Sequence, residues 1–192
     1  IIKGEEKGMK NKFIMTPSQE LSFVKSRLDD YIYNSMLLAR YEVSKDQCDG
    51  REDIEGEEEK KALDNFKEAY DFLLANTQRE ADYDVLIELH TILMKGLMDD
   101  VRNELSPEQI EELNLMIDQP AKANTEIAID VFLHILDKRL FTDGDVRVAL
   151  MFADKIMIDH GNGFLTITPD NREKFRTLLK QYNDTKEGEE FK

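Results

Sequence analysis

The segment from residue 145 to residue 160 is apolar on almost every side of the helix that its composition predicts. A helix without a polar face has to be surrounded by other parts of the protein, so we expect it at the centre of a helical domain. Gly161 follows it, and glycine closes helices because it adopts the left-handed backbone at little cost. The apolar residues are Val146, Val148, Ala149, Leu150, Met151, Phe152, Ala153, Ile156, Met157 and Ile158.

Other stretches carry apolar residues at helical spacing and predict the helices that surround this segment. Two of them begin with a matching start signal, Thr16-Pro17-Ser18-Gln19 and Ser106-Pro107-Glu108-Gln109, in which a hydroxyl caps the helix and glutamine completes the capping box. Asp170 and Glu173 predict a similar box before the last helix. The expected helices cover about 16–43, 58–76, 84–98, 107–118, 124–139 and 171–182, with a short extended piece at 164–167. The prediction is an all-α bundle around a central buried helix, with at most a short β-hairpin.

The length of 192 residues favours one domain. Residues 1–15 lack a clear period and are expected to form a flexible arm, 16–186 a single helical domain, and 187–192 an acidic tail. The polar stretch at 45–59 is rich in Asp and Glu and reads either as a solvated loop or as an acidic binding surface.

The formal net charge of −15 sets limits on the partners of this chain. Such a surface repels phosphate backbones, so nucleic acid and anionic membranes are not expected as partners. The single cysteine, Cys48, cannot form an internal disulfide, and no Cys/His cluster indicates zinc. No apolar stretch reaches the length of a membrane span, and we expect a cytoplasmic protein.

The loop at 140–147 carries the residues with the clearest chemical potential. It leads into the central helix, whose first N–H groups and dipole form a site for anions. Arg147 in the first turn can reach a phosphate, and Asp143 can hold Mg²⁺. The same residues also allow a structural interpretation, in which Asp143 or Asp145 caps the helix, Gly144 makes the turn and Arg147 lies on the surface.

This loop resembles the signature of the Fic (filamentation induced by cAMP) family, H-P-F-x-D/E-G-N-G-R-x-x-R. Phe141 matches the aromatic anchor, Asp143 the metal-binding acid, Gly144 the first glycine and Arg147 the first arginine. The flanking segments resemble the family too, in order and spacing, from about residue 60 to 185. They are the L-H-x-x-L-x-x-G-L pattern of 89–97, the central helix with its glycine break at 149–167, and the closing segment at 174–185.

The signature is degraded at five positions of the loop and helix. Arg139 stands at the histidine position, Leu140 at the proline position, Asp145 at the asparagine position, Val146 at the second glycine and Leu150 at the second arginine. Many family members also carry an inhibitory helix with an S/T-x-x-x-E-G/N motif. In this chain the motif that would begin at Ser35 lacks its closing residues, so we do not expect an inhibitory helix of that kind.

Fic enzymes transfer AMP from ATP to a protein hydroxyl, and the motif histidine is their general base. The resemblance therefore implies ATP and Mg²⁺ as cofactors, with Asp143 at the metal, Phe141 as the loop anchor, and Gly144, Asp145, Val146 and Arg147 at the phosphates. A guanidinium does not deprotonate in proteins, so Arg139 cannot act as the base. Asp145 adds a negative charge near phosphate, and Val146 adds bulk where glycine lets the backbone approach.

We therefore expect a Fic-fold protein with lost or strongly reduced catalysis, which acts as a binding or regulatory module. Its partner would be an unidentified protein target or regulator, and a homo-oligomer is compatible with the sequence. The alternative is an active nucleotidyl- or phosphotransferase with a different base. His90, His134 and His160 are the candidates, and His134 is favoured because it is closest to the loop in sequence. A third interpretation is an unrelated helical bundle whose match is coincidental.

Overall fold

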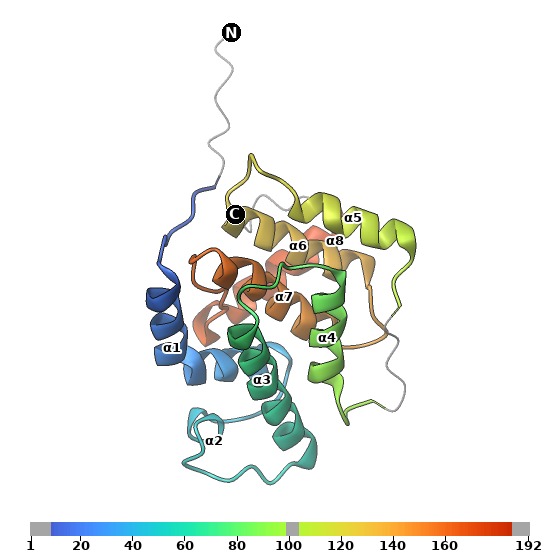
Figure 1. Cartoon of the computed structure of the whole chain (residues 1–192). Helices are drawn as coiled ribbons and strands as arrows, with labels where there is room; N and C mark the ends of the chain where they lie inside the picture. The colour runs from blue at the N-terminus through green and yellow to red at the C-terminus, as the bar shows by residue number, and fades with distance from the viewer. Residues whose placement is uncertain (1–8, 99–103, 186–192) are drawn as a thin grey trace.

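The computed structural model describes residues 9–98 and 104–185, and within them the fold is all-α (Figure 1). The elements are α1 (Pro17–Leu38), α2 (Lys45–Cys48), α3 (Glu57–Ala75), α4 (Tyr83–Met94), α5 (Pro107–Ile117), α6 (Asn124–Lys138), α7 (Asp145–Asp159), the 3-10 helix η1 (Pro169–Asn171) and α8 (Arg172–Thr185). The described residues form no strand, and an isolated bridge between Lys95 and Met98 is their one β-type pairing. The predicted extended piece at 164–167 does not pair as a strand with any described residue.

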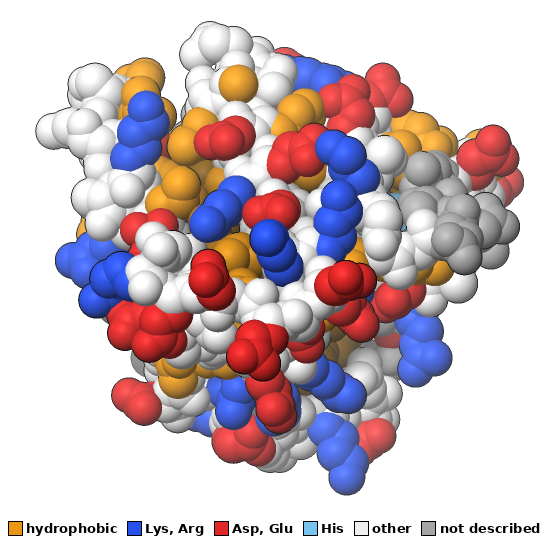
Figure 2. Space-filling view, turned by 90° about the horizontal axis from the view of Figure 1, so that it is seen from below, with side chains coloured by type: hydrophobic (Ala, Val, Ile, Leu, Met, Phe, Trp, Pro, Cys, Tyr) orange, Lys and Arg blue, Asp and Glu red, His pale blue; other side chains and the backbone are white. Residues whose placement is uncertain are grey.

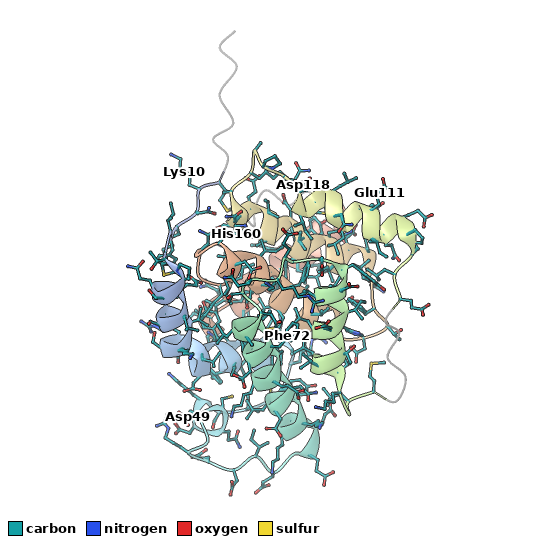
Figure 3. The ribbon with its side chains drawn as sticks, viewed as in Figure 1. Lys10, Asp49, Phe72, Glu111, Asp118 and His160 are labelled. Carbon is teal, nitrogen blue, oxygen red and sulfur yellow. The ribbon has the colours of Figure 1, made fainter. Side chains whose placement is uncertain are left out.

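Helix α7 is the centre of the bundle, as its apolar composition predicts. Every residue from Val148 to Ile158 is buried, and α1, α3, α4 and α6 pack around it (Figure 1). Side chains fill the spaces that the ribbon leaves between these helices (Figure 3). Two buried charged residues of α7 have partners. Asp154 accepts hydrogen bonds from the Tyr70 hydroxyl at 3.0 Å and from the Leu165 N–H at 2.7 Å, and Lys155 bonds three acceptors.

Two of the three predicted capping boxes are present, those of Thr16 and Ser106. The hydroxyls of Thr16 and Ser106 accept hydrogen bonds from the N–H groups of Gln19 and Gln109. Each glutamine Oε1 in turn accepts one from the N–H of its cap residue. These local interactions satisfy N–H groups that a helix leaves without partners, so α1 and α5 begin where the sequence places them.

The predicted helices differ from the structure in four places, one of which is the end of α4 at Met94 rather than near residue 98. α1 ends at Leu38 rather than near residue 43, because Arg40 takes a left-handed backbone with φ 71° and turns the chain. The predicted loop at 45–59 contains the short helix α2, which Ser44 caps. The last helix begins at Arg172, since Asp170 lies in η1 instead of capping it.

Residues 9–15, which the sequence assigns to a loose arm, lie along the ends of α6 and α7. Asn11 Oδ1 accepts from the N–H and the hydroxyl of Thr125, both at 3.0 Å. Further along, the Met15 N–H donates to the Gly161 carbonyl at 2.8 Å. The arm is thus hydrogen-bonded to the bundle at both of these points.

Charged side chains of both signs are mixed on one face of the molecule (Figure 2). Figure 2 shows Lys and Arg side chains interspersed with Asp and Glu on the face seen from below. Among the described helices, none combines the length and apolar character that a membrane crossing requires.

Candidate functional site

The loop between α6 and α7 is bounded by two left-handed residues. Arg139 ends α6 with φ 46° and ψ 62°, and Gly144 begins α7 with φ 85°. A side chain at Gly144 would place a Cβ 2.6 Å from the Met94 sulfur, so glycine is required both by its backbone and by its neighbour. Helix α4, which carries Met94, therefore fixes how closely the loop approaches the core.

His90 of α4 contacts the loop through its ring and through its Nε2 atom. Its ring stacks on Phe141, with centroids 3.9 Å apart and an interplanar angle of 19°. Its Nε2 lies 2.9 Å from the Asp143 carbonyl oxygen, and because a carbonyl only accepts, Nε2 carries the proton in this bond. Both rings are buried, with exposed fractions of 1% for His90 and 4% for Phe141. Phe141 is thus the apolar anchor of the loop, and a histidine of another helix is its partner.

Asp145 directs its carboxylate back into the loop. Oδ1 accepts a hydrogen bond from the Phe141 N–H at 3.1 Å. Burial raises the pKa of Asp145, and the Phe141 N–H partly offsets this by favouring the charged form. Asp145 therefore stabilises the turn through this hydrogen bond. The sequence allowed it either to cap the helix or to lie at the phosphates.

Asp143 and Arg147 form the polar edge of the site. Asp143 Oδ1 accepts from the Gly144 N–H at 2.6 Å, and Oδ2 lies 3.6 Å from Arg147 Nη2. The Asp143 side chain is 61% exposed, whereas that of Arg147 is 12% exposed. Arg147 is therefore largely buried, and the alternative in which it lies on the surface is wrong. Its Nη1 donates to the Tyr41 hydroxyl at 2.9 Å, and its guanidinium lies over the Tyr41 ring, 5.6 Å from the centroid.

Tyr41 links this polar edge to a cavity of about 750 Å³. The cavity is lined by Arg40, Arg172 and Arg176, together with Leu37, Tyr41, Glu42, Val43 and Ser44, and we call it the arginine pocket. Arg172 Nε is buried and has no hydrogen-bond acceptor among the described residues. Three guanidinium groups thus gather beside the loop in a chain with a net charge of −15. Sequence reasoning missed this cluster, because its members come from the end of α1 and the start of α8.

The three histidines that the sequence suggests as alternative bases lie in different parts of the fold. His134 lies on the side of α6 that faces α5, with Nε2 3.9 Å from Glu112 Oε2, and burial lowers its pKa. His160 sits at the opposite end of α7 from the loop, and its Nδ1 lies 2.7 Å from the Ile156 carbonyl (Figure 3). Of the three, His90 is the histidine that contacts the loop. Proximity in sequence was a poor guide here because a helix points successive residues in different directions.

Two degraded positions differ in their surroundings. Arg139 is exposed at the end of α6, whereas Leu150 is buried with an exposed fraction of 3%. Leu150 borders a small apolar cavity of about 160 Å³ with Phe132 and Phe175. Leucine carries no charge, so the cationic function of the second signature arginine is absent at this position.

A magnesium ion would find one exposed carboxylate at the loop, that of Asp143. The described residues contain no group of three or more His, Cys, Asp or Glu placed to hold a metal. Mg²⁺ commonly binds one or two carboxylates and completes its shell with water and phosphate oxygens. The exposed Asp143 fits that mode, with the ion bound together with a phosphorylated ligand.

Among the comparisons with known proteins, the one with solved structures identifies the fold. No protein family matches the sequence, and no curated protein matches it either. Among solved structures, a fragment of Fic-1 from C. elegans is 16% identical, with a TM-score of 0.71 over 88% of this chain. A variant of that fragment gives a TM-score of 0.72 at 16% identity. A Fic domain containing signaling protein from Bacteroides thetaiotaomicron is 15% identical, with a TM-score of 0.66 over 87% of this chain and 75% of its own length.

These likenesses show a Fic-like fold. The chain spans 58% of the length of the Fic-1 fragment and 59% of its variant. The fold implied by the degraded signature is therefore confirmed.

Proposed function

We propose that this protein is a Fic-fold binding module that takes a phosphorylated nucleotide beside the α7 loop and has lost, or nearly lost, AMP transfer. One observation carries the proposal: Arg139 stands at the position where the resemblance requires a histidine as the general base. General base catalysis contributes about 10²–10⁴-fold to a rate, so its loss leaves at best a slow enzyme.

Asp145 supports the loss of catalysis. Its carboxylate is hydrogen-bonded to the Phe141 N–H and lies at the first residue of α7, where the dipole of the helix would otherwise favour a phosphate. The local negative charge opposes an incoming phosphate. A ligand at this end of α7 would therefore depend on cations supplied from elsewhere.

The arginine pocket supports retained binding. Arg40, Arg172 and Arg176 line a cavity whose volume lies in the range of small-molecule sites, and Tyr41 places it next to Arg147. The buried Arg172 Nε needs an acceptor, and a phosphate oxygen is a strong one. Asp143 would hold Mg²⁺ together with the phosphates, and the ion would neutralise their charge.

A retained but slow transferase is the second candidate. The observation that favours it is the surviving pair of Asp143 and Arg147 at 3.6 Å, the two charged positions that match the signature. His90 would be the first base to test, because it touches the loop, although its Nε2 proton is engaged by the Asp143 carbonyl.

Calorimetric titration and thermal unfolding with ATP and Mg²⁺ test the binding proposal. A ligand at 100 times its Kd stabilises the folded state by about 2.7 kcal/mol. The variant Arg172→Gln/Arg176→Gln should remove most of this stabilisation. Arg27→Gln is the matched control, because Arg27 is an exposed arginine of α1 that pairs only weakly with Asp30 at 3.9 Å. Equal ATP affinity in the double variant and in the control would contradict binding at the arginine pocket.

A further inference from the structure

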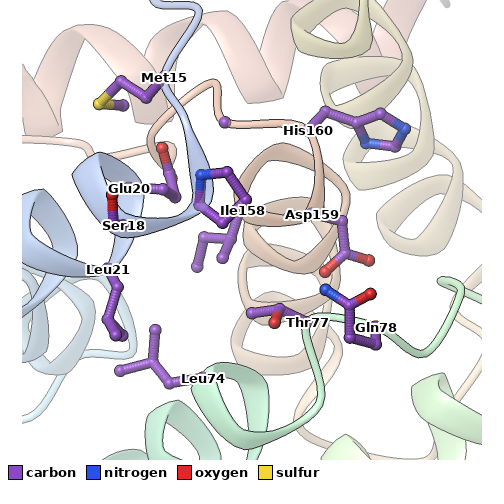
Figure 4. Close-up of a pocket in the computed structure, with 12 residues that line it drawn as sticks. Met15, Ser18, Glu20, Leu21, Leu74, Thr77, Gln78, Ile158, Asp159 and His160 are labelled. Carbon is purple, nitrogen blue, oxygen red and sulfur yellow. The ribbon is translucent and has the colours of Figure 1, made fainter.

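A second cavity lies at the other end of α7, about 20 Å along the helix from the loop. It has a volume of about 440 Å³ and is formed by the start of α1, the end of α3 and the end of α7 (Figure 4). Leu21, Leu74 and Ile158 make one wall apolar, and Ser18, Thr77 and Gln78 provide polar groups. We call it the Asp159 pocket, after the carboxylate that it shares with a neighbouring cavity of about 710 Å³.

Asp159 has a buried carboxylate, and one of its two oxygens lacks a hydrogen-bond donor among the described residues. Its side chain is 10% exposed, and Oδ2 bonds the buried ammonium of Lys155. Oδ1 has no hydrogen-bond partner among the described residues. Figure 4 shows the carboxylate directed toward Thr77 and Gln78, on the cavity side of α7. A buried carboxylate oxygen without a donor is costly, so this position calls for a donor that the described part of the chain does not supply.

Apart from the Lys155 ammonium that already pairs with Oδ2, the charges around this carboxylate favour a cationic ligand. The two cavities are lined by Glu20, Glu80, Asp82, Asp118 and Asp159, against a single basic residue, Arg79, and His160. Arg79 is already paired with Glu88 at 2.9 Å, and Glu20 accepts from the Gly163 N–H at 3.1 Å. The carbonyl end of α7 adds the negative pole of the helix dipole. An anion would be repelled here, whereas a protonated amine would be attracted.

Burial raises the pKa of Asp159 to about 6, although the Lys155 ammonium opposes that shift. The carboxylate is therefore charged at pH 7.5. Its Oδ1 is covered, and the exposed side chain of Gln78, which follows α3, points toward the carboxylate (Figure 4). Because exposed side chains change rotamer readily, Gln78 can move aside and let a donor reach Oδ1.

We propose that the Asp159 pocket binds a small organic cation, a protonated amine on an apolar body. The ammonium would donate to Asp159 Oδ1, and the apolar body would lie on Leu21, Leu74 and Ile158. This site is separate from the arginine pocket in both position and charge, so it does not depend on nucleotide binding.

Amide NMR spectra, recorded at pH 7.5 while 2-phenylethylamine is added, test the proposal. Saturable shifts are expected at Ser18, Leu21, Thr77 and Gln78. The neutral analogue 2-phenylethanol should bind at least about tenfold more weakly, because hydrogen bonds to a charged group are the stronger kind. The anion 3-phenylpropanoate should give no shifts at these residues. Equal affinity for the amine and the alcohol, or shifts confined to other parts of the chain, would overturn the proposal.

Three variants of the Asp159 pocket and one control variant locate the binding. Asp159→Asn should weaken the amine at least about tenfold, and Gln78→Ala should tighten it by uncovering Oδ1. Because Asp159→Asn also removes a partner of Lys155 and can impair folding, Leu21→Trp provides the independent test. Leu21 is 39% exposed, so tryptophan can fill the cavity without entering the core, and amine binding should disappear. Arg176→Gln in the arginine pocket should leave it unchanged. Undiminished binding in a folded Leu21→Trp protein would refute the assignment.

Discussion

The imidazole of His90 lies flat on the ring of Phe141, with the ring centroids 3.9 Å apart. The same imidazole bonds the carbonyl oxygen of Asp143, two residues further along the loop. One side chain of α4 therefore fixes both the apolar and the polar part of the turn into α7. This arrangement keeps the loop in place although its signature is degraded.

Replacing Phe141 by alanine should destabilise the fold strongly. Burial at 4% exposure and the stacked contact with His90 predict a loss of about 3–5 kcal/mol in the free energy of unfolding. Urea denaturation measures this loss. Leu115→Ala, at a 61% exposed position of α5, should change the midpoint little. Similar midpoints for the two variants would show that Phe141 does not anchor the loop.

Gly144→Ala should cost more than Gly50→Ala. Both glycines have positive φ, 85° and 81°, so both variants carry the backbone penalty of about 1–2 kcal/mol. A Cβ at Gly50 meets nothing within 4 Å, whereas one at Gly144 meets the Met94 sulfur at 2.6 Å. Overpacking typically adds about 1–3 kcal/mol. Chemical denaturation of the two variants measures the free energy of unfolding that each loses, and the difference isolates the contact with Met94. Equal losses would show that the Met94 side chain does not restrict a side chain at position 144.

Asp145→Asn should stabilise the protein at neutral pH but not in acid. Unfolded, Asp145 ionises near its ordinary pKa of 3.8, and burial raises this pKa in the folded state. As the pH rises from the unfolded pKa through the folded one, the unfolded state releases its proton first, so the aspartate lowers the stability. Asparagine stays neutral and keeps an oxygen that can accept from the Phe141 N–H.

Thermal unfolding of wild type and Asp145→Asn at pH 3 and pH 7 tests this sign. The two proteins should agree at pH 3, and the variant should melt higher at pH 7. Asp29→Asn, at an exposed position of α1, controls for the change in net charge. A lower melting temperature of Asp145→Asn at pH 7 would mean that the charge itself stabilises the turn.

Local signals in the sequence were reliable guides to the fold. The capping residues Thr16 and Ser106 and the apolar surface of α7 placed these elements correctly, because caps and core helices depend on neighbouring residues. The short α2 and the left-handed turn at Arg40 were missed. A helix of four residues shows no periodicity, and an arginine seldom adopts positive φ.

The candidate site was only partly accessible from the sequence. The loop residues are contiguous, so Asp143 and Arg147 could be assigned to one site from their spacing. The contacts that define their setting come from distant segments, namely His90 on α4 and Tyr41 after α1. Which distant side chains meet the loop depends on how the helices pack, and no local pattern encodes that.

Transfer of label from ATP to protein tests the central claim, a Fic fold whose catalysis has been lost at the loop. The protein is incubated with labelled ATP, Mg²⁺ and a cell lysate, next to the variants Arg139→His, Asp145→Asn, Val146→Gly and their combination. We predict background labelling by the unmodified protein and little gain from each single change. The combination should exceed the sum of the singles, since residues of one catalytic unit act non-additively. Strong labelling by the unmodified protein that is abolished by Asp143→Ala or Arg147→Ala would contradict the account.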